Sequence, residues 1–444
     1  MLLQNARVKS GCSGRGSLLK KQIALKRRAM LAAFLAACLL LCGCTAQDSV
    51  GAESGASLPA ANSTQPLSSS PAASSQTSSV PVSASSDEAS QTQDPEQPQR
   101  QPAVSDTSTP EEPDEIALLL ETMSLEEKVG QMFFVRCPEE GAAAVSQYQF
   151  GGYLLFGRDF EGKTPQQVSA DIQSYQQNAR LPLFIGVDEE GGTVNRISTN
   201  PNFRSSPFLS PRQLYAQGGM ELLQSNAQEQ CNLLASVGVN VNFAPVCDIA
   251  QNPADFMYDR SLGQDAQTTA DFVRMTVEVY RQNKMGSVLK HFPGYGDNAD
   301  THTGIAYDSR SLSALREKDW IPFAAGIQAG APCVLVSHNI VSAVDKDMPA
   351  SLSPAVHNLL RQELGFNGVI ITDDLSMGAI QEYTGASAAA VLAVKAGNDL
   401  LCCTDYETQL PAVVAAVQSG EISEEQINTS VARILQWKQS LGLL

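Results

Sequence analysis

Histidine is scarce in this 444-residue chain, and one of its four histidines stands beside an aspartate in a loop-like segment. Asp300 and His302 are separated by one residue within a Gly- and Asp-rich stretch at 294–304. At this spacing both side chains can lie on the same side of an extended loop, where the carboxylate orients and charge-stabilises the imidazole. Such a pair can act as a general acid/base. From spacing alone, a loop histidine that only hydrogen-bonds its neighbours is the simpler interpretation.

More polar side chains close or follow short apolar runs. They are Arg158, Asp188, Asp248, Lys290 with His291, Ser337 with His338, and Asp373 with Asp374. Any one of them could cap a helix or satisfy loop amides. If the runs are parallel strands of one barrel, however, the whole set meets at the carboxyl-end mouth, where catalytic groups converge. The remaining histidine, His357, falls in a helical pattern at 353–364 and is interpreted as a helix-surface residue.

The apolar runs that would position these residues number eight. They are 131–135, 152–156, 183–187, 239–243, 286–290, 332–336, 369–373 and 399–403. Helical patterns separate most of them, for example at 265–282 and 311–329, and continuous apolar strands are typical of a parallel sheet covered on both faces. A doubly wound open sheet has the same alternation, but eight strands without a GxGxxG after the first favour a barrel. We therefore predict the α/β class, with a (β/α)8 TIM-type barrel forming a single catalytic domain over 115–444.

Two segments precede the predicted barrel. In residues 1–44, basic residues are followed by an uncharged stretch at 29–43, which is shorter than the roughly 20 residues that span a bilayer. The stretch ends in Leu41-Cys42-Gly43-Cys44 and resembles a bacterial lipobox, so we expect a lipoprotein signal peptide with lipid on Cys44. An ordinary secretory signal is the alternative. Residues 45–114 are rich in Ser, Thr, Pro and Gln and are expected to form a disordered linker, or a glycosylated stalk.

The charge of the chain after residue 44 disfavours some classes of binding partner. The first 44 residues hold eight of the 30 basic residues and no acidic one, so 22 basic residues face 47 acidic residues in the remainder. Such a surface should repel nucleic acid and anionic lipid. Membrane attachment, at the extracellular face of a bacterial membrane, would therefore depend on the lipid anchor.

The six cysteines after the leader show no CxxC or CxxH spacing. They are Cys137, Cys231, Cys247, Cys333, Cys402 and Cys403, all in apolar surroundings. Buried free thiols are therefore expected rather than a zinc site or a disulfide framework. With no phosphate loop or dinucleotide fingerprint, no cofactor is implied.

Several motifs in a fixed order resemble glycoside hydrolase family 3, in its single-domain β-N-acetylhexosaminidase branch. They are KHFPGYGD at 290–297, DTH at 300–302, ITDDLSM at 371–377, GVDEEGG at 186–192 with Arg196, APVCD at 244–248, and RSLG at 260–263. The resemblance spans essentially all of 115–444. It implies release of terminal β-linked N-acetylhexosamine, such as GlcNAc from peptidoglycan or chitin fragments, by a retaining double displacement.

The resemblance also implies roles for single residues. Asp373 would be the nucleophile, and His302 the acid/base with Asp300 as its partner. The sugar-binding residues would be Asp188, Arg196, Arg260, Lys290 and His291. The chain departs from the family pattern at Glu189, Thr193, Tyr295 and Thr301, which we interpret as loop and rim residues that affect leaving-group preference.

Other functions stay open on the sequence. β-Glucosidases and β-xylosidases of the same family usually take their acid/base from an additional C-terminal domain, for which this chain, ending at Leu444, has no room. A glycoside phosphorylase, an inactive sugar-binding lipoprotein, and a Schiff-base aldolase using Lys290 are further alternatives.

Overall fold

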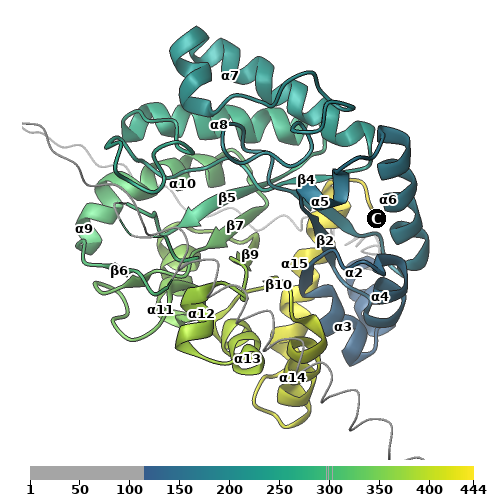
Figure 1. Cartoon of the computed structure of the whole chain (residues 1–444). Helices are drawn as coiled ribbons and strands as arrows, with labels where there is room; N and C mark the ends of the chain where they lie inside the picture. Colours follow the sequence, from purple (N-terminus) through teal and green to yellow (C-terminus); the bar gives the residue numbers. More distant parts are fainter. Residues whose placement is uncertain (1–114, 297, 299, 303) are drawn as a thin grey trace, which may run out of the picture. The chain divides into compact units, whose positions relative to one another are not determined.

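Eight parallel strands form a nearly closed barrel in the computed structural model, which describes residues 115–444 except 297, 299 and 303. The strands are β1 (Phe133–Arg136), β2 (Gly152–Leu155), β3 (Phe184–Val187), β4 (Val241–Asn242), β5 (Gly286–Phe292), β7 (Cys333–Val336), β9 (Val369–Thr372) and β10 (Leu401–Cys403). Their order is β10-β1-β2-β3-β4-β5-β7-β9, and a parallel bridge between Ile371 and Leu400 joins the two ends (Figure 1). The predicted barrel and its eight strands are confirmed.

The predicted strand ends differ from the observed ones by a few residues for physical reasons. Gln131 completes a helix rather than opening β1, and its side-chain amide donates to the carbonyl of Gln149 at 2.8 Å. β4 is only two residues long, although a bridge from Val246 to Lys290 continues its pairing with β5. A short parallel pair, β6 (Tyr307–Asp308) and β8 (Ile340–Val341), lies outside the barrel sheet.

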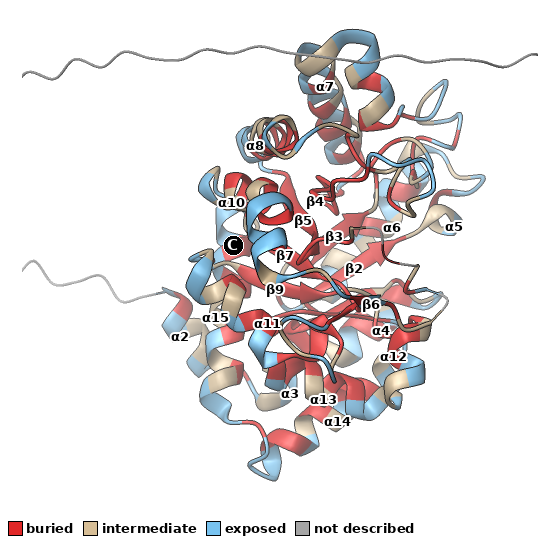
Figure 2. Cartoon of the chain, turned by 90° about the vertical axis from the view of Figure 1, so that its left-hand side faces the viewer, coloured by how far each residue is buried: buried red, intermediate tan, exposed pale blue. Residues whose placement is uncertain are grey.

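Helices surround the barrel (Figures 1 and 2). They are α2 (Glu115–Glu121), α3 (Leu125–Gln131), α4 (Gly141–Tyr148), α5 (Gly157–Phe160), α6 (Pro165–Asn178), α7 (Pro211–Ser236), α8 (Ala266–Gln282), α9 (Leu312–Ala314), α10 (Trp320–Gln328), α11 (Pro354–Asn358), α12 (Gly378–Tyr383), α13 (Ala386–Ala396), α14 (Tyr406–Gln418) and α15 (Glu424–Ser440). Shorter turns are η1 (Leu315–Asp319), η2 (Ala350–Leu352) and η3 (Leu359–Glu363). The predicted helix at 265–282 is α8, capped by Asp265, whereas the one at 311–329 is divided by the π-helical turn η1.

Aromatic side chains fill the lower barrel. Phe134 stacks on Phe184 and meets Phe243 edge to face, with ring centroids 6.1 and 5.2 Å apart. Gly186 makes room for them, because a Cβ at this position would lie 2.8 Å from ring atoms of both Phe134 and Phe243. Trp437 of α15 packs against Phe184, with 4.3 Å between the two ring centroids. This packed layer closes the barrel beneath the polar mouth.

Two expectations about single residues have opposite outcomes. All six cysteines from Cys137 onward are buried free thiols, as predicted. The assignment of His357 to the helix surface is wrong, because α11 turns it inward, where Nδ1 donates to the carbonyl of Ser353 at 2.8 Å. The predictions for residues 1–114, namely the signal peptide, the lipidated Cys44 and the linker, lie outside the described residues.

A buried lysine lies beneath the barrel floor. Lys438 of α15 is fully buried, and its Nζ donates to Oε1 of Gln131 at 2.6 Å and lies 5.2 Å from the ring centroid of Phe184. Burial lowers the pKa of this lysine to about 7. Since an unfolded lysine has a pKa near 10.4, the unfolded chain binds the extra proton between about pH 7 and 10. Lys438 therefore makes the fold more stable as pH rises through that window.

Replacing Lys438 by Met should remove this pH dependence. The free energy of unfolding of the unchanged protein, relative to Lys438→Met, should rise by roughly 2 kcal/mol between pH 7 and 9. Urea denaturation at both pH values measures it. Thiols of the unfolded chain lose protons in the same range, but equally in both proteins, so the difference isolates Lys438. Parallel pH curves for the two proteins would contradict the assignment.

Candidate active site

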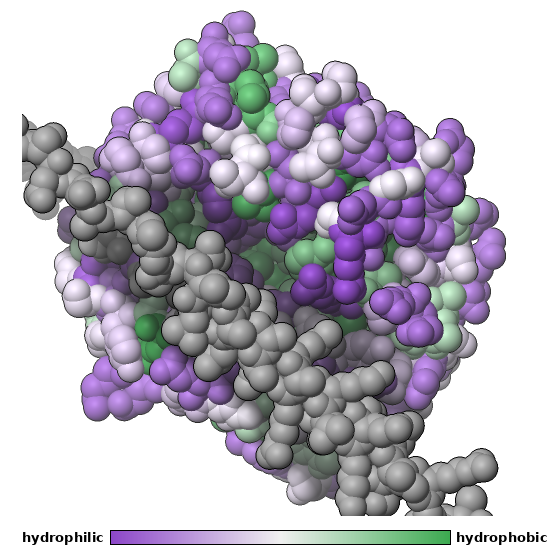
Figure 3. Space-filling model, in the orientation of Figure 1, coloured by the Kyte–Doolittle hydropathy of each residue, from purple (hydrophilic) through white to green (hydrophobic). Residues whose placement is uncertain are grey.

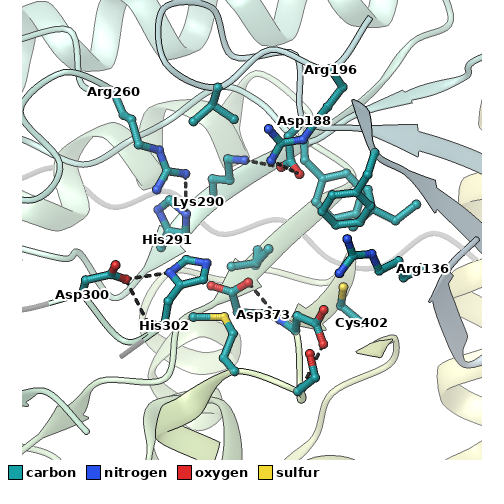
Figure 4. A pocket seen from close by; sticks show the side chains of 18 of the residues that line it. Arg136, Asp188, Arg196, Arg260, Lys290, His291, Asp300, His302, Asp373 and Cys402 are labelled. Carbon is teal, nitrogen blue, oxygen red and sulfur yellow. Dashed lines mark hydrogen bonds and ion pairs between the residues drawn. The ribbon is translucent and has the colours of Figure 1, made fainter. Parts of the chain in front are cut away.

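A cavity of about 660 Å³ opens at the carboxyl ends of the strands (Figure 4). All eight side chains that the sequence predicts for catalysis or sugar binding line it: Asp188, Arg196, Arg260, Lys290, His291, Asp300, His302 and Asp373. Figure 3 shows this face of the molecule, which carries many hydrophilic residues. The structure therefore brings together residues from β3, β5, β9 and the loops between them, while Cys44 lies outside the described residues.

Asp373 lines this cavity, one residue past β9. Its backbone N–H donates to the carbonyl of Val336 at 3.0 Å, which holds it on the barrel rim, and its Oδ1 accepts from the N–H of Asp374 at 2.9 Å. Burial opposes ionisation, but His338, His291 and the Asp374 N–H outweigh it and lower the pKa of Asp373 below its ordinary value. An ionised carboxylate with a free oxygen edge can attack an electrophilic carbon.

The neighbouring Asp374 is engaged in holding the loop. Its Oδ1 accepts from the N–H of Ser376 at 2.8 Å and its Oδ2 from Oγ1 of Thr404 at 3.2 Å. Its carbonyl accepts from Nε2 of the buried His338 at 3.0 Å, and burial lowers the pKa of that histidine. Asp374 is thus a structural partner of Asp373.

The Asp300–His302 pair forms as the spacing allows. Nδ1 of His302 lies 2.6 Å from Oδ1 of Asp300, which also accepts from the His302 backbone N–H at 3.0 Å. The carboxylate accepts, so Nδ1 carries the proton and Nε2 is left for other partners. The imidazole is 59% exposed at the cavity edge, where it can exchange protons with a ligand and with solvent.

A buried carboxylate that the sequence did not single out organises the opposite wall. Glu190 is 1% exposed; its Oε1 lies 2.5 Å from Nζ of Lys290, and both its oxygens accept from Arg260, at 2.7 and 2.9 Å. Burial opposes its charge, but Arg260 and Lys290 hold the pKa of Glu190 well below its usual range. Lys290 also donates to Oδ1 of Asp188 at 2.8 Å, and Arg196 approaches the other oxygen of Asp188 at 3.5 Å.

His291 is fixed from both sides. Its Nδ1 lies 2.7 Å from Oδ2 of Asp248, and its Nε2 lies 3.2 Å from Nη2 of Arg260. A carboxylate only accepts and a guanidinium only donates, so the proton is on Nδ1. Asp248, which the sequence analysis noted at a strand end, is buried and orients His291 rather than lining the cavity.

Other strand-end residues differ from expectation. Arg158 does not reach the cavity, because α5 begins at Gly157 and turns its side chain to the carbonyl of Cys137 at 2.5 Å. Arg136, missed by the sequence analysis, lines the cavity at the end of β1, with its guanidinium 4.1 Å from the ring centroid of Phe156. Its place as the last residue of an apolar run is the signal that could have found it.

Three of the four departures from the family pattern are not rim residues. Glu189 is fully buried and accepts from the backbone N–H groups of Arg196 and Ile197 at 2.8 and 2.9 Å. Tyr295 and Thr301 are buried and bonded to each other. Only Thr193 lines the cavity. The interpretation of these residues as rim positions is therefore wrong for Glu189, Tyr295 and Thr301.

Two absences concern the described part of the chain, 115–444 without its three gaps. No cluster of three or more His, Cys, Asp or Glu side chains there could hold a metal ion. No helix in that part combines the length and the apolar character needed to cross a membrane.

The adjacent buried glutamates should respond differently to loss of charge. Glu190→Gln leaves Lys290 and Arg260 without their shared counter-charge, so we expect a loss of about 3–5 kcal/mol in the free energy of unfolding. Among the described residues, no cation forms an ion pair with Glu189, and burial raises the pKa of Glu189 despite its hydrogen bonds. One glutamine oxygen can still accept from the N–H groups of Arg196 and Ile197, but the amide nitrogen that replaces the other oxygen cannot accept from the N–H and hydroxyl of Ser198. Glu189→Gln should therefore cost about 1–2 kcal/mol, less than Glu190→Gln. Chemical denaturation at pH 7 compares the two, and equal losses would contradict the network.

The family was identified by comparison with known proteins. Residues 124–437 match the model of the glycosyl hydrolase family 3 N terminal domain. The chain is 34% identical to the Beta-hexosaminidase of Xanthomonas campestris pv. campestris (strain B100) over 297 residues, which is 66% of this chain and 84% of the relative.

Two longer proteins are also similar. Beta-hexosaminidase A of Pseudoalteromonas piscicida is 29% identical over 333 residues, 68% of this chain and 56% of that protein. The solved β-N-acetylglucosaminidase of glycoside hydrolase family 3 from Paenibacillus sp. str. FPU-7 is 33% identical, with a TM-score of 0.67 over 72% of this chain and 63% of that chain. The chain thus spans less than two thirds of these two proteins. On the family match and the barrel, the chain belongs to glycosyl hydrolase family 3.

Proposed function

We propose that this chain hydrolyses terminal, non-reducing, β-linked N-acetylhexosaminides, with GlcNAc of peptidoglycan or chitin-type fragments as the substrate class. The observation that carries the proposal is the convergence of Asp373 and the Asp300–His302 pair on one cavity of about 660 Å³. The β-hexosaminidase names of similar proteins support the choice of sugar.

The reaction would proceed in two displacements. The ionised carboxylate of Asp373 attacks the anomeric carbon, while the protonated Nε2 of His302 gives its proton to the departing oxygen as the glycosidic bond breaks. His302 then takes a proton from water, which attacks the glycosyl–Asp373 ester and releases the sugar and the carboxylate. Two inversions at one carbon give retention of configuration.

The carboxylate of Asp300 would help His302 to act in both steps. Its carboxylate, 2.6 Å from Nδ1, stabilises the imidazolium that must form before the first step and again after the second. A histidine titrates near neutral pH without the burial that a carboxylic acid needs for the same role. This agrees with the exposed setting of His302.

The charged wall would hold the sugar. Asp188 accepts from hydroxyls, and Arg260, Lys290 and His291 present donors or acceptors that the protein has already oriented. Arg196 borders the same region through Asp188. Nζ of Lys290 contacts two carboxylates, those of Asp188 and Glu190, and these contacts hold it in this wall.

Replacing Asp373 by Asn should abolish turnover of an aryl β-N-acetylglucosaminide, by 10⁴-fold or more as an order of magnitude for loss of a nucleophile. The matched variant is Asp374→Asn, which loses loop contacts but no reacting group and should retain measurable turnover. A 5-fluoro-N-acetylglucosaminyl fluoride should label Asp373, detected by mass spectrometry of the peptide.

Three results would count against the proposal. They are unchanged turnover in Asp373→Asn, an inverted first product by proton NMR, and faster cleavage of aryl glucoside than of aryl N-acetylglucosaminide. Formation of a sugar 1-phosphate in phosphate buffer would instead favour phosphorolysis.

We also propose a location for this activity. The segment before Cys44 resembles a lipoprotein signal, and the remainder of the chain is strongly acidic, with 22 basic against 47 acidic residues, which disfavours binding to an anionic membrane surface. A diacylglycerol on Cys44 would tether the barrel outside the cell through the linker at 45–114. The carbohydrate substrate and the membrane would then be its two partners.

Cys44→Ala tests the anchor in the full chain expressed in a bacterial host. The unchanged protein should sediment with membranes, resist high salt and be released by detergent, whereas the variant should stay out of the membrane fraction with unchanged specific activity. Membrane association that survives the substitution would refute a lipid on Cys44.

A further inference from the structure

Tyr295 lies at the base of the loop that carries His302. Its side chain is buried, and its phenol oxygen accepts from the backbone N–H of Thr301 at 2.9 Å and lies 2.8 Å from Oγ1 of Thr301. Since the phenol accepts from the N–H, its own proton is available for the threonine oxygen. Thr301 is the residue between Asp300 and His302. The phenol therefore hydrogen-bonds to the residue that joins the two members of the acid/base pair.

Tyr295 is itself fixed to the barrel. Its backbone N–H donates to Oδ1 of Asp248 at 2.7 Å, and the other oxygen of the same carboxylate lies 2.7 Å from Nδ1 of His291. The Tyr295 ring lies 5.7 Å from the ring of His291, edge to face, and 5.4 Å from that of Phe256. One buried aspartate thus sets both a wall of the sugar pocket and the foot of the loop.

The loop is held on its other side by α12. The carbonyl of Thr301 accepts from the N–H of Ala379 at 3.2 Å, and a Cβ at Gly378 would lie only 2.7 Å from the carbonyl oxygen of His302. Thr301 is therefore bonded to the phenol through its N–H and to α12 through its carbonyl. The phenol links Thr301 to Tyr295, which lies three residues past the end of β5.

Burial also keeps the phenol of Tyr295 in one protonation state. It raises the pKa of Tyr295 to about 12, so the hydroxyl stays protonated over the whole range in which a histidine titrates. A histidine at the same position would change charge in that range. Tyrosine thus provides both a donor and an acceptor that do not respond to pH.

We propose that Tyr295 is a positioning residue for His302: through Thr301 its phenol fixes the imidazole in register with Asp373, using Asp248 as an anchor shared with His291. The inference rests on the proposed function, because it takes His302 to be the proton donor. It assigns a role to a residue at which the chain departs from the family pattern.

Tyr295→Phe tests the role, because it removes only the hydroxyl. If proton donation is impaired, kcat/KM should fall most for substrates whose leaving group needs the proton. We expect a loss of about tenfold or more for a poorly activated glycoside, within the 10²–10⁴-fold that general acid catalysis supplies, and less than about threefold for a dinitrophenyl glycoside. Azide needs no base to attack the glycosyl ester, so it should accelerate the variant and yield a glycosyl azide.

Matched variants separate positioning from general damage. Tyr153→Phe removes another buried phenol, which donates to the carbonyl of Gly141 at 2.7 Å on the outer side of β2. It should leave the leaving-group dependence unchanged. Thr301→Val removes the Oγ1 contact and keeps the N–H. Its effect should be smaller in the Tyr295→Phe background than alone, because the two residues share one bond.

The leaving-group comparison uses ratios within each protein, so it can be read for any glycoside that the unchanged enzyme cleaves. If the proposed sugar is wrong, the unchanged enzyme will prefer another glycoside. The ratio of kcat/KM between two leaving groups can then be measured with that glycoside instead. The positioning role is overturned if Tyr295→Phe lowers kcat/KM equally for both leaving groups, if azide has no effect, or if Tyr153→Phe gives the same pattern. It is also overturned if the unchanged enzyme cleaves no glycoside.

Discussion

The carboxylate of Glu190 has to be neutralised where no water reaches it, and much of the cavity follows from that requirement. An uncompensated buried ion costs several kcal/mol, which is a large part of the 5–15 kcal/mol that stabilises a domain. Lys290 and Arg260 both contact Oε1 of Glu190, and this carboxylate holds the two cations in place. Their remaining donors then face Asp188 and His291. The proposed sugar-binding wall is therefore held in place by a charge that the proposed reaction never touches.

The fold was predictable because each strand is a continuous apolar run, and the mouth was predictable because polar residues end those runs. The partners that individual side chains find in the folded protein were not predictable. Glu189 and Glu190 are adjacent and chemically identical in sequence, yet one accepts backbone N–H groups and the other bridges two cations. Likewise, the pattern around His357 could not show that α11 turns it inward.

The two proposed reacting groups, Asp373 and His302, are held in position in different ways. Asp373 is fixed to the neighbouring strand through Val336 and its charge is favoured by nearby histidines, so its geometry belongs to the barrel. His302 stands on a loop and is exposed, so its geometry depends on a few hydrogen bonds at Tyr295 and α12. The sequence motif identifies both residues but does not reveal this difference. The proposed nucleophile therefore belongs to the barrel, whereas the proposed proton donor belongs to a loop.

The barrel joins strands from the two ends of the domain, since Phe133 of β1 pairs with Leu401 of β10. During synthesis, β1 therefore keeps an unpaired edge until more than 260 further residues have been made, and contacts this distant in sequence form slowly. Helices such as α8 can form earlier from local contacts. An interrupted translation product that lacks β10 would expose the edges of both β1 and β9, which makes it a substrate for chaperones or for aggregation.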